Sequence, residues 1–349
     1  MQTTQFQNFI GGRWVSSESG NSYPVNNPAF KNVILGTAQR SDIVDAKRAI
    51  ESAHQALSRW AETPAPQRGT IIYRAFELLR ARKSEFAKTI TEEEGKSLSD
   101  ALGEVNRSMN ILEYAAGEGR RMFGQTTPSE LPNTLAYTTR RPLGVVSIIT
   151  PWNFPLAIPS WKIAPALICG NTVVFKPATS TPLSGINLVS LFEEAGLPPG
   201  VLNIITGPGS AIGDTLVTHP MVKGVSFTGS TDTGSRLYSM GARQLKKVQC
   251  EMGGKNAVIV LSDADIEKAL TAVVEGAFGS TGQRCTATSR LIIEDAIYDN
   301  FISALIDMTK KLRIGYGLLP GIDIGPASSE EQLEQILRYI ELGKVEGAT

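Results

Sequence analysis

One short segment of the chain has the composition of an active-site loop. Residues 279–290 read GSTGQRCTATSR, which places Cys285 among small and hydroxylated side chains with no large apolar residue. A thiol near its reference pKa of about 8.5 is only a few per cent ionised at pH 7, so a nucleophilic cysteine needs positive potential or a base beside it. Arg284 can supply that potential. From this loop alone, a nucleophile and an inert cysteine are equally good interpretations.

Five further segments combine glycine, proline and polar residues, and each directly follows a predicted strand. They are residues 150–155 (TPWNFP), 176–179 (KPAT), 207–209 (GPG), 229–234 (GSTDTG) and 251–256 (EMGGKN). Ligands of open parallel sheets bind beyond the carboxyl ends of the strands, so these segments are candidates for a ligand site. Gly229 opens a helix whose N-terminal amides could hold a phosphate, although its segment is neither a GxGxxG fingerprint nor a P-loop. Taken singly, Glu251 is more often a solvated acid, and Asn153 is equally well a turn residue.

The periodicity of apolar residues predicts the elements that position these segments. Strands are predicted over 145–149, 172–175, 202–205, 224–227 and 246–250, with helices over 157–169, 183–195, 211–217 and 231–240 between them. This alternation indicates a parallel sheet with right-handed crossovers, which is an α/β, doubly wound, Rossmann-like domain. A second α/β unit follows Gly253. Helices over 41–60, 66–95 and 98–122 precede the sheet, and the acidic run 92–94 is interpreted as solvated surface.

The composition argues against several classes of protein. Lys+Arg and Asp+Glu both total 34, so no net field draws the chain to nucleic acid or to an anionic membrane. The three cysteines are widely spaced and the two histidines stand alone, which gives no disulfide set and no zinc motif and indicates a cytoplasmic enzyme. Residues 143–175 carry a single charge, Lys162, but the four prolines among them favour buried elements over a membrane span.

Taken together and in this order, the segments TPWNFP, KPA, FTGS, EMGGKN and GQRC resemble the aldehyde dehydrogenase family over essentially the whole chain. The resemblance implies that Cys285 is the nucleophile, Glu251 the general base and Asn153 a donor to the oxyanion. It also implies a nicotinamide dinucleotide cofactor. The residues expected to contact this cofactor are Thr150, Trp152, Asn153, Lys176, Pro177, Ala178, Thr179, Gly209, Gly229, Ser230 and Met252.

The chemistry that this resemblance implies needs no metal. The thiolate of Cys285 adds to the aldehyde carbon, and the oxyanion is held by the Asn153 amide and the Cys285 backbone N–H. Hydride transfer to the nicotinamide then leaves a thioester on the cysteine. Glu251 activates the water that hydrolyses this thioester and releases a carboxylic acid.

The resemblance also implies a domain organisation. We expect a dinucleotide-binding domain over residues 1–129 and 150–252, an oligomerisation arm over 130–149, and the N-terminal part of a catalytic domain over 253–349. The full-length protein is expected to be a homodimer or homotetramer. Because the family continues with further catalytic and interface segments, we expect this chain to be C-terminally truncated, poorly soluble and inactive by itself. A non-catalytic nucleotide-binding relative is the alternative.

Two finer expectations concern the cofactor and the substrate. Many NAD-preferring family members carry Glu where this chain has Thr179, and a hydroxyl does not repel a 2'-phosphate, so NADP is expected to be preferred, with NAD possible. Residues 114–119, 157–165 and 279–290 look most like 2-oxoglutarate semialdehyde (2,5-dioxopentanoate) dehydrogenases. Arg284 or Lys162 could bind the carboxylate of such a substrate. Succinate semialdehyde or another short-chain aldehyde is the alternative substrate.

Overall fold

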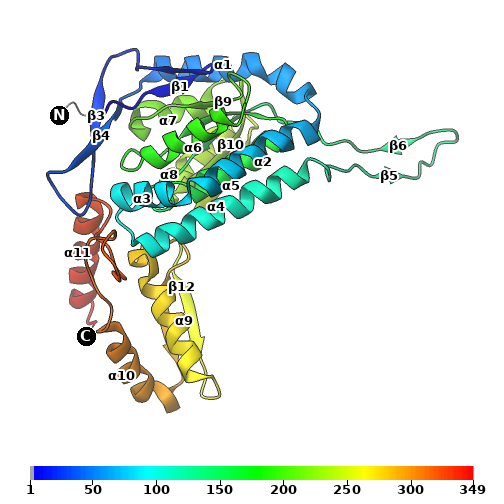
Figure 1. Cartoon of the computed structure of the whole chain (residues 1–349). Helices are drawn as coiled ribbons and strands as arrows, with labels where there is room; N and C mark the ends of the chain where they lie inside the picture. Colours follow the sequence, from blue (N-terminus) through cyan, green and yellow to red (C-terminus); the bar gives the residue numbers. More distant parts are fainter. Residues whose placement is uncertain (1–3, 349) are drawn as a thin grey trace.

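The computed structural model describes residues 4–348, and its centre is a seven-stranded sheet (Figure 1). The strand order is β11-β10-β7-β8-β9-β1-β2. The bounds are β7 Val145–Ile149, β8 Thr172–Lys176, β9 Leu202–Ile204, β10 Val222–Gly229, β11 Lys247–Met252, β1 Asn8–Ile10 and β2 Arg13–Val15. Strands β7 to β11 are parallel, whereas β1 and β2 pair antiparallel at one edge. The expected doubly wound α/β fold is confirmed.

Helices cover both faces of the sheet because successive side chains of a buried strand point to opposite sides. Val173 and Phe175 of β8 pack into one core, and Val174 packs into the other. The first core is closed by α2 Ala65–Ala81, α3 Lys83–Glu94, α4 Leu98–Glu118, α5 Ala157–Ile168 and α6 Leu183–Glu194. The second core is closed by α1 Ile43–Glu62, α7 Gly209–Thr218 and α8 Thr231–Ala242.

The helices before the sheet agree with the expected ranges to within a few residues, with one exception. Helix α1 begins at a capping box in which the carboxylates of Asp42 and Asp45 accept from each other's backbone amides. The helix expected over 66–95 is instead α2 and α3, with a break at Arg82. The Arg82 guanidinium donates two hydrogen bonds of 2.6 Å to the carboxylate of Glu194 in α6. No proline or glycine marks this break, so periodicity alone did not reveal it.

A hairpin of β5 Thr126–Thr127 and β6 Ala136–Tyr137 projects from the body of the protein (Figure 1). It lies in the part of the chain where an arm is expected, but the expected boundaries of 130–149 need correction. The hairpin starts before residue 130, and β7 lies in the middle of the sheet between β10 and β8. All five residues of β7 are buried, which only a core strand allows.

The chain after the sheet forms a second α/β unit, which extends away from the sheet in Figure 1. Parallel strands β12 Asn256–Val260 and β13 Thr288–Ile293 pack against α9 Ile266–Phe278 and α10 Tyr298–Thr309. The core of this unit consists of Val260, Leu270, Val273 and Phe301. The remaining elements are β3 Ser22–Asn26, β4 Ile34–Gln39, the short 3-10 helices η1 Gly279–Gly282 and η2 Asp295–Ile297, and α11 Glu330–Val345.

The apolar stretch over residues 143–175 is divided among β7, α5 and β8 of the core, as its prolines indicated. Of the helices within residues 4–348, none has both the length and the apolar character needed to cross a membrane.

Candidate active site

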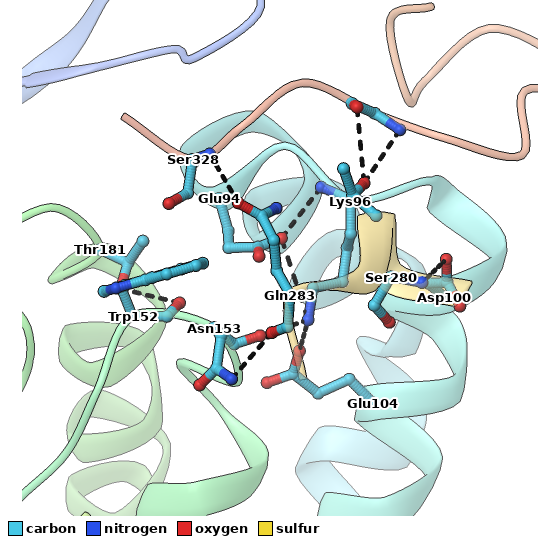
Figure 2. A network of polar contacts seen from close by, with 12 residues as sticks. Glu94, Lys96, Asp100, Glu104, Trp152, Asn153, Thr181, Ser280, Gln283 and Ser328 are labelled. Atoms are coloured by element: carbon cyan, nitrogen blue, oxygen red, sulfur yellow. Dashed lines mark hydrogen bonds and ion pairs between the residues drawn. The ribbon is translucent and has the colours of Figure 1, made fainter. Parts of the chain in front are cut away.

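The carboxyl ends of the parallel strands bring the expected cofactor segments together. The backbone N–H of Thr150, after β7, donates to the carbonyl of Lys176 at the end of β8 over 3.2 Å. Gly229 and Met252 are register partners at the ends of β10 and β11. Trp152 joins the same edge through its carbonyl, which accepts from the Thr181 hydroxyl over 3.3 Å (Figure 2). Sheet register, with one side-chain bond between the loops, therefore places these separate segments side by side.

The candidate cofactor site beyond the carboxyl ends of β7 to β11 is called the strand-end cradle below. Two neighbouring loops form one end of this cradle. The Thr179 hydroxyl donates to the carbonyl of Gly207 over 3.2 Å, which ties the loop after β8 to the loop after β9. A Cβ built on Gly209 would lie 3.8 Å from Cε of Lys176, so the lysine stem runs beside this glycine. Burial lowers the pKa of Lys176 to about 8, and its ammonium donates to the Pro177 carbonyl over 2.9 Å. A buried cation beside a side-chain-free backbone suits a hydroxylated or anionic ligand group.

The start of α8 forms the next part of the cradle. Ser230 is the N-cap of this helix, and its hydroxyl accepts from the Thr233 backbone N–H. A Cβ at Gly234 would lie 2.6 Å from the sulfur of Met252, so this glycine lets the helix pack against β11 without moving the methionine side chain. The helix N-terminus that remains exposed is a general anion site.

One further observation supports the binding of a dinucleotide by these residues. The hydroxyl of Thr150 is buried and has no hydrogen-bond partner among residues 4–348. Such an atom has a desolvation penalty that a ligand hydroxyl or amide can remove. Within the described residues, no group of three or more His, Cys, Asp or Glu is arranged to hold a metal ion.

The structure brings Asn153 and the Cys285 loop into direct contact. The Asn153 side-chain amide donates to the carbonyl of Gln283 over 2.9 Å (Figure 2). The side-chain amide of Asn256 donates to the carbonyls of Cys285 and Ala287 over 2.8 and 3.2 Å. The thiol-bearing residue itself is exposed. Two asparagines from different strand ends therefore fix the backbone on either side of an accessible cysteine.

The backbone just before Cys285 has an unusual conformation. Ser280, Thr281 and Gly282 are consecutive left-handed residues, with φ of 52°, 59° and 68°. Each non-glycine residue in this region costs on the order of 1–3 kcal/mol, so surrounding contacts must hold it. The carboxylate of Asp100 accepts from the Ser280 backbone N–H over 3.0 Å, and the Thr281 hydroxyl accepts from the Gly325 N–H over 3.1 Å.

Glu251 is exposed at the end of β11, where water can reach it. Its carboxylate accepts from the side-chain amide of Gln249 over 2.7 Å. The side-chain oxygen of Gln249 in turn accepts from the Lys162 ammonium over 3.2 Å, and this ammonium also donates to Ser226 over 2.7 Å. Burial lowers the pKa of Lys162 to about 8, although the charge of Glu251 opposes that shift. This geometry places Lys162 beside the acid and gives no support to its expected role in binding substrate.

Arg284, like Lys162, is engaged by contacts within the protein. Its guanidinium donates to the carbonyls of Glu275 and Gly276 in the last turn of α9. Both carbonyls lie in the last turn of the helix, where the Glu275 carbonyl also accepts from the Gly279 N–H, so the arginine closes the helix end and anchors the loop. The expectation that it binds a substrate carboxylate is not supported by this geometry.

The interpretation of residues 92–94 as solvated surface is wrong for two of the three. Glu93 and Glu94 are both buried, whereas Glu92 is half-buried. Glu93 accepts from the backbone N–H groups of Leu183 and Ser184, at the start of α6, over 2.7 and 2.8 Å. Burial raises the pKa of Glu93 to about 7. Its position seven residues after the buried Phe86 places it on the apolar face of α3, a signal that was present in the sequence.

Another buried acid, Glu104, supports the Asn153 segment, and this role was not predicted from the sequence. One oxygen of Glu104 accepts from the N–H groups of Leu156 and Ala157 over 2.9 and 3.0 Å, and the other accepts from the Lys96 ammonium over 2.7 Å. Glu94 lies 3.9 Å from the same ammonium. Burial opposes the charge of Lys96, but Glu104 and Glu94 outweigh it and raise the lysine pKa. Glu104 follows the buried Ala101 by three residues, which again indicates the apolar face of its helix.

The chain is similar to known proteins over nearly its whole length. A sequence model of the Aldehyde dehydrogenase family matches residues 14–349. The alpha-ketoglutaric semialdehyde dehydrogenase of Bacillus subtilis (strain 168) is 48% identical over 344 residues, which cover 99% of this chain and 70% of that protein. The 2,5-dioxopentanoate dehydrogenase of Saccharolobus solfataricus is 46% identical over 341 residues, with coverages of 97% and 71%. The crystal structure of an E. coli NADP dependent enzyme superposes with a TM-score of 0.96 at 36% identity, covering 99% of this chain and 71% of that one.

Replacing Lys96 by Met should lower the free energy of unfolding by about 3–5 kcal/mol, because Glu104 and Glu94 would remain buried without a counter-charge. The loss should be smaller at pH 5 than at pH 8, since burial raises the pKa of Glu94 to about 7 and its carboxyl is neutral below that value. Urea denaturation measures both quantities. The matched control is Lys88→Met, which removes an exposed lysine 3.8 Å from Glu92 and should change stability by under about 1 kcal/mol. An equal loss of unfolding free energy in the two variants would contradict the role of Lys96 as the counter-charge of the buried acids.

Proposed function

The chain belongs to the aldehyde dehydrogenase family, and we propose that it oxidises 2-oxoglutarate semialdehyde (2,5-dioxopentanoate) to 2-oxoglutarate with a nicotinamide dinucleotide. The observation that carries the proposed chemistry is the hydrogen bond from the Asn153 amide to the loop of an accessible Cys285. The choice of substrate is supported by two relatives at 48% and 46% identity, whose names state this aldehyde or its synonym. Succinate semialdehyde and other short aldehydes stay as the competing substrates.

In the first step, the thiolate of Cys285 adds to the aldehyde carbon and the carbonyl electrons move to oxygen. An asparagine side-chain amide has two N–H groups, and one of those on Asn153 is used by the Gln283 carbonyl. The other N–H is available to the oxyanion, together with the backbone N–H of Cys285. The bond to Gln283 thus orients the donor before substrate arrives, which is how an oxyanion site lowers a barrier.

The cofactor would be held by the strand-end cradle, with Lys176 and Thr179 at its ribose and Gly229 and Ser230 at its phosphates. When bound, it accepts the hydride that leaves the substrate carbon, so that the acyl group remains on Cys285 as a thioester. Glu251, exposed at the end of β11, then removes a proton from the water that attacks this thioester. The carboxylic acid product leaves, and the thiolate of Cys285 is regenerated.

The experiment that tests this function is a reduced-nicotinamide absorbance assay with a panel of aldehydes, on the protein purified as the cell produces it, because residues 1–349 by themselves are expected to be inactive. We expect the highest kcat/KM on 2-oxoglutarate semialdehyde, no turnover for Cys285→Ala, and kcat lowered about 10²–10³-fold for Asn153→Ala. Cys169→Ala is the matched control, because Cys169 is also an exposed cysteine and lies at the end of α5. Full activity of Cys285→Ala would refute the mechanism, and equal turnover of butanal would refute the choice of substrate.

We also propose that NADP is preferred over NAD. Thr179 carries no charge, and the nearby Lys176 ammonium can neutralise a 2'-phosphate. Thr179→Glu should lower the NADP-to-NAD ratio of kcat/KM by at least about tenfold, because a carboxylate repels that phosphate. Ser239→Glu, at the far end of α8 from Ser230, adds the same charge and should leave the ratio unchanged. A wild-type protein that is more efficient with NAD would contradict the proposal.

The projecting hairpin supports a homo-oligomer, either a dimer or a tetramer, in which the arm contacts another subunit. Leu131 and Leu135 at its tip are 68% and 76% exposed within one chain, an arrangement that a partner surface would relieve. Leu131→Asp/Leu135→Asp should lower the molar mass measured by sedimentation velocity. Leu245→Asp, a change at a 94% exposed leucine outside the arm, is the control. An unchanged mass for the arm variant would exclude this role.

The cytoplasmic location stays a prediction from the cysteine pattern.

A further inference from the structure

We propose that the segment from Lys96 to Glu104, which leads into α4 and forms its first turns, is a positioning element that sets the Asn153 amide against the Cys285 loop. None of these side chains reacts in the mechanism above, so the inference concerns how the reacting groups are held. It rests on the proposed function for its catalytic meaning. Figure 2 shows the residues concerned, which come from α4, the loop after β7 and the loop after α9.

One side of this element holds the segment that carries Asn153. The Lys96 ammonium donates to the backbone carbonyl of Asn153 over 2.6 Å, and Glu104 receives the N–H groups of Leu156 and Ala157. Both charged side chains are at most 1% exposed. Their mutual bond of 2.7 Å makes the two contacts a single unit. The backbone from Asn153 to Ala157 is therefore attached to one segment, which runs from Lys96 into α4.

The other side of the element holds the Cys285 loop. The carboxylate of Asp100 accepts from the Ser97 hydroxyl and from the backbone N–H of Ser280, both over 3.0 Å. Ser280 is the first of the three left-handed residues, and its carbonyl accepts from the Gln283 N–H over 3.0 Å. The Gln283 carbonyl in turn receives the Asn153 amide. The hydrogen bonds thus form a closed ring from α4 through both loops and back to α4.

This arrangement is what an oxyanion site requires. A donor must lie about 2.7–3.1 Å from the position that the oxyanion will occupy, and a displacement of about 1 Å can cost on the order of 10²-fold in rate. Burying an ammonium and a carboxylate is an inefficient way to gain stability, because apolar side chains of similar volume often do as well. The ring offers a different reason for their presence, which is the geometry of the donor.

The first test is a double-mutant cycle on kcat. Lys96→Met/Glu104→Gln, which leaves no unpaired charge between these two residues, should lower kcat about 10–100-fold with KM changed less than about threefold. In the Asn153→Ala background the same pair of changes should lower kcat less than about threefold, because the donor that it positions is already gone. If the pair of changes lowers kcat by the same factor in the wild-type and Asn153→Ala backgrounds, the proposal is overturned, since a general structural role gives that result.

The second test does not need turnover. Asp100 is half-buried, so Asp100→Ala is expected to fold, and hydrogen exchange measured by mass spectrometry should become faster in peptides covering 279–287. Asp45→Ala is the matched control, because Asp45 is also the third residue of a helix and its carboxylate accepts from the backbone N–H of the distant Glu18 over 3.1 Å. Unchanged exchange at 279–287 in the Asp100 variant would overturn the proposal. Failure of the wild-type protein to oxidise any aldehyde would count against the proposed function alone, and the exchange result would still decide the positioning role.

Discussion

The reacting half of the site depends on one buried ammonium group, that of Lys96. Lys96 is removed from water, and the loss of its hydration costs several kcal/mol unless hydrogen bonds and opposite charges replace it. The carboxylate of Glu104 and the carbonyl of Asn153 supply those bonds, and both belong to the structure around the site. The solvation demand of the lysine and the geometry of the Asn153 segment are therefore satisfied by the same contacts.

The two halves of the site are built on different physical principles. The cofactor cradle follows from backbone register, because parallel strands that pair at Val145 and Thr172 must also end side by side. The reacting half depends on side chains: Asn153 and Asp100 each hold one backbone group of the Cys285 loop, and Asn256 holds two. Strand pairing thus sets the backbone of the first half, whereas single side chains set the geometry of the second.

Sequence reasoning succeeded for regular elements with a periodic pattern and failed for irregular backbone and for specific side-chain contacts. Strand β7 is at its expected residues because five consecutive apolar or small residues follow a glycine and precede a proline-rich loop. The contact between Asn153 and the Cys285 loop was implied only by the order of motifs. Nothing in the sequence marks the left-handed run at Ser280, since a serine and a threonine occupy positions that glycine would favour. The partner of Arg284 was equally hidden, because a helix end has to be located before its capping group can be named.

The bonds that assemble the reacting half join residues that are far apart along the chain. Lys96 and Asn153 are separated by 57 residues, Asn153 and Gln283 by 130, and Asp100 and Ser280 by 180. Chains emerge from the ribosome from the N-terminus, and contacts with large sequence separation close late because loop closure opposes them. The strands of the sheet are synthesised before the cysteine, because β11 ends at Met252. The loop that carries the thiol is thus the last part of the reacting half to be made, and its arrival completes the orientation of the Asn153 amide through the carbonyl of Gln283.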